Sequence, residues 1–221
     1  MILKEIIYSI REDFRIMSDD SDITNEYLAY LIRNARGVVL QQRYADPRNV
    51  VPAVELQSIT VPIGTNGKST IALPSVIKTT GNANSSLKVY GVGLAGTSLS
   101  TPLNVVSLER LPFVGNNPYL TDQIYCAVDE DGYLVFNSKN NVYKLVESVI
   151  ARGLFEDPET AYTVNGGTSD FYSLKYPLSE QNLLDVRKIV DLKLSNLFKI
   201  PKDELNDSTE EGLTANPQGN K

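Results

Sequence analysis

The heptapeptide from Gly64 to Thr70 is the stretch of this sequence whose residue types are best suited to chemistry. It reads Gly-Thr-Asn-Gly-Lys-Ser-Thr. Glycines ahead of a lysine and a hydroxyl side chain are typical of loops that bind nucleotide phosphates. In such a loop the backbone N–H groups and the N-terminus of a following helix hold the phosphates. A nucleotide-binding enzyme is therefore one hypothesis for the function.

The heptapeptide is close to the glycine-rich ATP loop of the Mur-ligase and folylpolyglutamate-synthase group, but its surroundings argue against that role. The residues after Lys68 are β-branched and lead to Pro74, so no helix can follow the loop directly. The first glycine of the wider phosphate-loop pattern would fall at Pro62. Asn66-Gly67 between two β-rich runs favours instead a type I′ hairpin at a sheet edge.

Other residue types that commonly catalyse reactions or bind metals are scarce. The chain contains no histidine and a single cysteine, Cys126, which excludes Ser-His-Asp and Cys-His catalysis and ordinary structural zinc sites. The acidic turns at residues 18–22 and 129–132 lack the spacing of a calcium loop, and they fit a helix cap and a hairpin turn. Carboxylate- or lysine-based catalysis stays open in principle. We nevertheless predict a protein that is not an enzyme and has no catalytic residues, cofactor or metal.

Composition and charge argue against several other classes of protein. The net charge is −6 and there is no run of Lys or Arg, whereas a protein that clamps nucleic acid needs clustered basic residues. No apolar run approaches the roughly 20 residues of a membrane span, and the N-terminus does not resemble a signal peptide. The single cysteine fits synthesis in a reducing cytoplasm.

Hydrophobic periodicity places helices at both ends of the chain. A 3.6-residue period predicts helices over residues 2–17, 24–44 and 179–198, with Asp22 or Thr24 as the cap of the second. The residues between them alternate apolar runs with Gly, Pro, Asn and Asp, which predicts strands and loops. The plainest hairpin joins residues 123–128 to 133–136. Residues 142–154 fit a helix or a strand, and residues 155–177 are expected to be mostly loop.

These elements predict an α+β protein. The N-terminal helical hairpin and the C-terminal helix should form a small bundle, with an antiparallel β-rich insertion between them. We expect residues 1–50 and 178–200 to form a helical domain and residues 51–177 to form the insertion. Residues 201–221 are polar and should be an extended or disordered tail.

The second predicted helix carries two non-polar stripes. One is aliphatic and should pack on the first helix. The other lies on nearly the opposite side and mixes small, aromatic and arginine residues, which is typical of surfaces where proteins meet. It could also pack on the third helix or on the β region of the same chain. As a candidate subunit interface we select from this stripe Tyr30, Arg33, Gly37, Leu40 and Tyr44.

Both helical ends carry a further pattern. The first is the Ser-Asp turn at residues 18–22 followed by Glu26-Tyr27-Leu28, and the second is the closing segment at residues 200–207, Ile-Pro-Lys-Asp-Glu-Leu-Asn-Asp. With Arg33, Arg36, Gln41, Gln42 and Arg43, these segments resemble the head-to-tail connector proteins of short-tailed phages. They are most similar to the tail ring proteins of crAss-like gut phages.

The resemblance implies a structural virion protein, made in the host cytoplasm. It implies a homo-oligomeric ring, commonly twelvefold, that contacts the portal protein and neighbouring tail ring proteins. The genome would pass through the ring during ejection, with transient non-specific contact to DNA and none to a membrane. The helical part would build the ring wall, and β modules would project from it. A carbohydrate- or receptor-binding β module is another hypothesis, because Gly, Tyr and Asn are frequent around Tyr119 and Tyr162.

Overall fold

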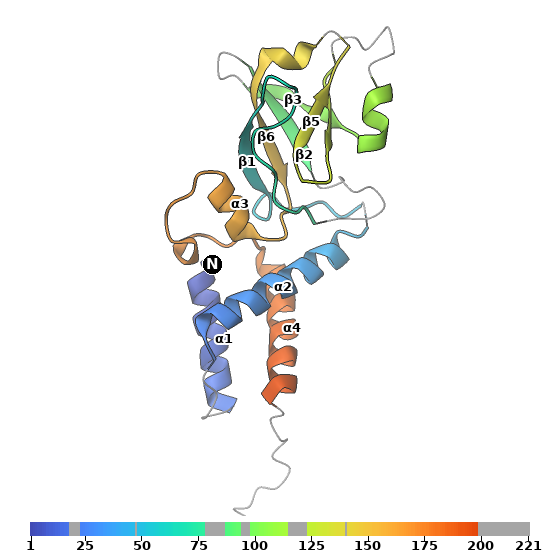
Figure 1. Ribbon diagram of the computed structural model, residues 1–221. Helices are drawn as coiled ribbons and strands as arrows, with labels where there is room; N and C mark the ends of the chain where they lie inside the picture. The colour runs from blue at the N-terminus through green and yellow to red at the C-terminus, as the bar shows by residue number, and fades with distance from the viewer. Residues whose placement is uncertain are drawn as a thin grey trace, which may run out of the picture.

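The protein has a helical end and a sheet end (Figure 1). The computed structural model describes residues 1–17, 23–46, 48–77, 87–93, 98–114, 123–139 and 141–198. Within these residues the strands lie between the N-terminal helices and the helix that ends at Phe198, which confirms the predicted α+β class with a β-rich insertion. The predicted domain boundaries stay a prediction, and the tail at residues 201–221 lies outside the described residues.

Three long helices build the helical end: α1 (Leu3–Met17), α2 (Asn25–Arg43) and α4 (Glu180–Phe198). Figure 1 shows α2 lying across α1 and α4. Thr24 is the cap of α2, where its Oγ1 accepts a hydrogen bond from the Tyr27 N–H at 3.3 Å. The apolar stripes predicted from the periodicity meet in one core, to which the helices contribute Ile6, Ile10, Phe14, Leu28, Ile32, Ala35, Val186, Val190 and Leu194.

Six strands form one sheet in the order β1-β6-β2-β3-β4-β5. Their bounds are β1 Gln57–Pro62, β2 Lys88–Gly93, β3 Ser98–Val105, β4 Tyr125–Val128, β5 Leu134–Asn137 and β6 Val146–Gly153. Most neighbours are antiparallel, and β4 with β5 is the hairpin predicted from the sequence. The β3–β4 pairing is parallel, so the sheet is mixed. Residues 142–154 form a short 3-10 turn, η3 (Val142–Leu145), and then the strand β6.

A second hydrophobic core lies within the sheet end. It contains Cys126, which is fully buried, as expected for a cysteine within an apolar strand. Burial raises the pKa of the Cys126 thiol to about 12, so the thiol stays protonated and unreactive near neutral pH. The other buried side chains of this core include Ile59, Val61, Val89, Leu134, Val149 and Phe155.

The prediction that residues 155–177 are mostly loop was wrong in part. They include α3 (Pro158–Val164) and the short turn η4 (Phe171–Ser173). The start signals of α3 are local: Pro158 occupies its first turn, and the Asp157 carboxylate accepts a hydrogen bond from the Glu159 N–H at 3.1 Å. A helix of 7 residues is too short to show a clear 3.6-residue period, so periodicity did not reveal it.

A buried carboxylate joins the end of α2 to the start of α4. Glu55 is fully buried and accepts hydrogen bonds from the Tyr44 hydroxyl at 2.7 Å and from the Asn182 amide at 2.6 Å. It also accepts one from the Ser179 N–H at 3.0 Å, at the N-terminus of α4. Burial and the bond to Glu55 raise the pKa of Tyr44 to about 12, so its hydroxyl remains a donor.

Arg36 of α2 makes a second buried connection. Its Nη1 donates to the Phe155 carbonyl at 2.7 Å, just after β6, and its Nε donates to the Pro177 carbonyl at 3.2 Å, just before α4. The guanidinium lies 6.0 Å from the centroid of the Tyr176 ring. Burial lowers the pKa of Arg36, and the negative charge of Glu55 opposes this effect. Arg36 therefore ties α2 to both segments that enter the helical end from the sheet side.

We predict that Glu55→Ala lowers the free energy of unfolding by about 3 kcal/mol, because it removes the acceptor of two buried donors, on Tyr44 and Asn182, and of the partly buried Ser179 N–H. Urea unfolding followed by circular dichroism measures the change. The control is Glu130→Ala, which removes the same charge from an exposed position. Equal stability of the two variants would contradict the structural importance of this network.

Candidate functional site

The segment from Gly64 to Thr70 forms a tight turn. The Gly64 carbonyl accepts the Gly67 N–H at 3.1 Å, and the Gly64 N–H donates to the Lys68 carbonyl at 2.8 Å. Gly67 has a φ of +73°, whereas Asn66 does not have a positive φ. A type I′ turn needs positive φ at both central residues, so that prediction was wrong. The geometry is that of a β-turn followed by one left-handed glycine.

This turn joins the two outer strands of the sheet. The Ser69 N–H donates to the Leu134 carbonyl and the Phe136 N–H donates to the Gly67 carbonyl, both at 2.8 Å, along β5. The Thr70 N–H donates to the Pro62 carbonyl at 3.0 Å, at the end of β1. The Ser69 hydroxyl, which a phosphate loop would offer to a nucleotide, accepts the Leu134 N–H at 2.9 Å. The heptapeptide thus bridges β5 and β1, the two outer strands of the curled sheet.

Lys68 has partners of its own within the sheet end. Its Nζ lies 2.7 Å from the Asp129 carboxylate and 4.3 Å from the centroid of the Tyr133 ring. Partial burial acts to raise the pKa of Asp129, but hydrogen bonds from Lys68 and from the backbone outweigh it and hold this pKa below its ordinary value. No helix begins between residues 68 and 77, all of which are described. The structural context of a phosphate loop is therefore missing.

Two residues of the predicted interface lie inside the chain. Leu40 and Tyr44 are 0% and 5% exposed and belong to the helical core. Tyr44 is also held by its hydrogen bond to Glu55. For these two side chains the structure shows the intramolecular packing that the sequence had left open as an alternative.

The other three residues of the predicted interface keep contact with solvent. Tyr30 is 56% exposed and stacks on Tyr27, with ring centroids 6.5 Å apart. Arg33 reaches the first turn of α3, where it pairs with Asp157 at 3.2 Å and Glu159 at 2.9 Å. The open surface of α2 thus begins at its N-terminal half and continues past Arg33 to Gly37.

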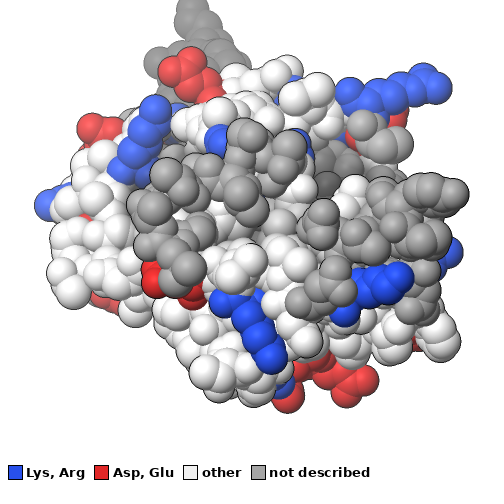
Figure 2. All heavy atoms as spheres, turned by 90° about the horizontal axis from the view of Figure 1, so that it is seen from above, with Lys and Arg blue, Asp and Glu red and all other residues white. Residues whose placement is uncertain are grey.

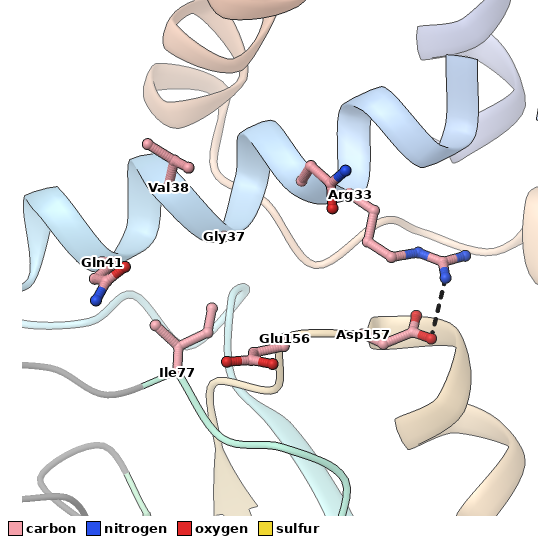
Figure 3. Close-up of a pocket in the computed structure, with 8 residues that line it drawn as sticks. Arg33, Gly37, Val38, Gln41, Ile77, Glu156 and Asp157 are labelled. Atoms are coloured by element: carbon pink, nitrogen blue, oxygen red, sulfur yellow. Dashed lines mark hydrogen bonds and ion pairs between the residues drawn. The ribbon is translucent and has the colours of Figure 1, made fainter. Parts of the chain in front are cut away.

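A groove of about 500 Å³ follows this open surface. Figure 3 shows Gly37 and its neighbours on α2 facing Ile77 and Glu156 across the groove, with the ion pair between Arg33 and Asp157 at one end. A methyl group built on Gly37 would meet no heavy atom within 4 Å, so the glycine leaves the wall of the groove open rather than permitting a close helix contact. The remaining wall residues are Asn34, Val38 and Gln41.

The helical end also exposes large apolar side chains that sequence reasoning had placed incompletely. Leu184 and Leu192 of α4 are 60% and 64% exposed. Tyr27, which the candidate interface omitted, is 38% exposed beside Tyr30. Its spacing of three residues from Tyr30 was the available signal, since residues three apart share a helix face.

Neither a membrane span nor a metal cluster was found in the part of the chain that the structure describes. None of its helices is long and apolar enough to cross a bilayer. The same residues contain no group of three or more Cys, Asp or Glu side chains that could hold a metal ion. The candidate site is instead the exposed surface of α2 and α4, where large aromatic and aliphatic side chains are open to solvent.

A comparison with known protein families identifies the family of this chain. The family described as "Phage tail ring protein 2" matches residues 5–212. The chain belongs to this family. The resemblance seen at the two helical ends is thereby confirmed, and the match also spans the β insertion, which the sequence motifs alone did not cover. A phage tail ring protein is a structural component of the virion, and that is the role and location of this chain.

A curated relative agrees with the family. Ring protein 2 of Bacteroides phage crAss001 is 26% identical over 227 residues, and the alignment covers 96% of this chain and 98% of that protein. The two proteins are therefore similar from end to end, so the similarity extends to both the helices and the sheet.

The geometry around Lys68 leads to a prediction about nucleotides. ATP with Mg²⁺ should leave the melting temperature of the protein unchanged, because the loop lacks a following helix and Ser69 is engaged by the backbone. Lys68→Ala should lower the melting temperature modestly through loss of the contacts to Asp129 and Tyr133. Differential scanning fluorimetry measures both effects, with Lys144→Ala as an exposed control. Stabilisation by ATP that Lys68→Ala abolishes would restore the nucleotide-binding hypothesis.

Proposed function

We propose that the chain is one subunit of a homo-oligomeric ring in the head-to-tail connector or tail of a short-tailed phage. The ring surrounds part of the channel through which the genome leaves the head. The observation that carries this proposal is the pair of exposed apolar faces on the helical end, in a chain that belongs to a tail ring family. The proposal includes twelve copies, and contacts with the portal protein and with adjacent tail rings.

The two faces meet the geometric requirement of a ring. A cyclic head-to-tail contact is heterologous, so every subunit needs two different patches that fit each other. One face lies on α2 at Tyr27 and Tyr30, and the other lies on α4 at Leu184 and Leu192. Figure 1 shows α1 and α4 on two sides of the helical end, with α2 crossing both.

The outer strands of the sheet are less suited to carry the ring contact. Residues 67–69 already pair with β5, and Thr70 bonds to the end of β1. On β1 the Thr60 N–H also donates to the Asn165 side chain at 2.9 Å. Covered strand edges do not template further strand pairing. This favours a ring wall built from helices, with the sheet projecting toward neighbouring rings or the outside.

The charge distribution supports a surface past which DNA moves without being held. The net charge is −6. Figure 2 looks down on the sheet end, and on its described part the Lys and Arg side chains are scattered rather than gathered into one patch. Phosphate binding needs clustered cations, so contact with passing DNA is transient and non-specific.

The carbohydrate- or receptor-binding alternative draws less support. Tyr162, one of its two motivating residues, is hydrogen-bonded to Ser169 and lies 6.0 Å from the ring of Phe171. Its ring is therefore used in internal packing rather than offered to a ligand. The second residue, Tyr119, lies outside the described residues.

The direct test is the copy number of the assembled particle. Native mass spectrometry and negative-stain imaging should show one closed ring of fixed copy number, twelve, formed by the purified chain alone or on the portal protein. A chain that stays monomeric at high concentration, and also in the presence of the portal protein, would overturn the proposal.

A further inference from the structure

The outer face of α4 alternates apolar and basic side chains. Leu184, Lys188 and Leu192 follow one another at intervals of four residues, so each lies about 6 Å further along the helix. The two leucines are 60% and 64% exposed, and the Lys188 side chain is 75% exposed. Val186 and Val190, on another side of the helix, are fully buried in the core. This face is therefore apolar at both ends, carries Lys188 at its centre, and is left uncovered by the part of the chain that the structure describes.

The outer face of α2 is complementary in chemistry. Glu26 is exposed in the first turn, and the stacked rings of Tyr27 and Tyr30 follow it. Other charged groups lie nearby: after burial, which is the largest cause, Glu159 and Glu26 act to raise the pKa of Tyr172, Arg33 acts to lower it, and Asp170 acts to raise it. This face therefore offers flat aromatic surface with the exposed carboxylate of Glu26 beside it. Aromatic rings accept aliphatic side chains well and are enriched at protein contacts.

We propose that these two faces are the two halves of the ring contact. Leu184 and Leu192 of one copy lie on the Tyr27 and Tyr30 rings of the next copy, and Lys188 faces Glu26 of that copy. This inference rests on the proposed ring function, because a second copy of this chain is the occupant of each face. Each copy offers one face on α4 and the other on α2, so the contact continues from copy to copy until the ring closes.

The local partner of Lys188 does not oppose this contact. Lys188 lies 3.3 Å from Asp185, one turn earlier on α4, and Asp185 is also 3.7 Å from Arg43. An exposed pair within one helix contributes little to stability. Lys188 can therefore exchange Asp185 for Glu26 of a neighbour, while Arg43 keeps Asp185 paired.

Charge reversal tests the pairing. Lys188→Glu and Glu26→Lys each place like charges at every contact, so each variant alone should need on the order of tenfold more protein for half-assembly. An equimolar mixture of the two variants should assemble as well as wild type. Consider a ring in which the two variants alternate. At one contact the two substituted side chains meet with opposite charges, and at the next contact the unaltered Lys188 and Glu26 meet. Native mass spectrometry should show equal numbers of both variants in each ring.

Controls separate this inference from the proposed function. Lys144→Glu makes the same charge change at an exposed position of the sheet end and should assemble like wild type. Rescue by mixing also excludes misfolding, since a misfolded subunit cannot be restored by its partner. Normal rings from Lys188→Glu alone, or no rescue in the mixture, would overturn the proposed pairing while the ring function stands. Failure of the wild-type chain to form a ring would overturn both.

Discussion

The buried polar connections of Arg36 and Glu55 are the constraint on which the rest of the structure depends. Both residues are fully buried, and a buried charge is costly unless it is well bonded. Arg36 offsets part of this cost by donating to the carbonyls of Phe155 and Pro177, while its buried Nη2 has no hydrogen-bond partner in the described part of the chain. Glu55 offsets it by accepting hydrogen bonds from α2 and from the start of α4. These bonds fix where the chain leaves the sheet and where α4 begins. They therefore also fix the outer faces of α2 and α4 relative to each other.

Much of the fold could be predicted because it follows local rules. A 3.6-residue period places the three long helices, Asp-Gly marks the β4–β5 turn, and Thr24 caps α2. The parallel β3–β4 pairing could not be predicted, because it joins only Asn104 and Val105 to Tyr125 and Cys126 and depends on the tertiary fold. Arg36 and Glu55 were missed as core residues for a related reason. Periodicity counts charged residues as exterior, so it cannot show that these two have buried partners.

The candidate site, too, could be predicted from the sequence only in part. The sequence indicated a second non-polar stripe on α2, but the pattern of one helix does not reveal what covers it. The fold buries Leu40 and Tyr44 and leaves Tyr30 exposed, and it adds Tyr27 and the leucines of α4 to the open surface. The heptapeptide at Gly64 illustrates the opposite error. A pattern that satisfies a phosphate loop by residue type also satisfies a tight turn that joins β5 to β1, and only the neighbouring elements distinguish them.

A subunit of the proposed ring needs two contact faces held in a fixed relation, and the buried connections of Arg36 and Glu55 hold α2 and α4 together. A cryo-EM reconstruction of the phage tail tests this account most directly. The account predicts a closed ring in which α4 of each copy touches the first turns of α2 in the next, around the central channel, while the sheet lies away from this contact. Copies that touch through the sheet, or copies not arranged in a ring, would contradict it.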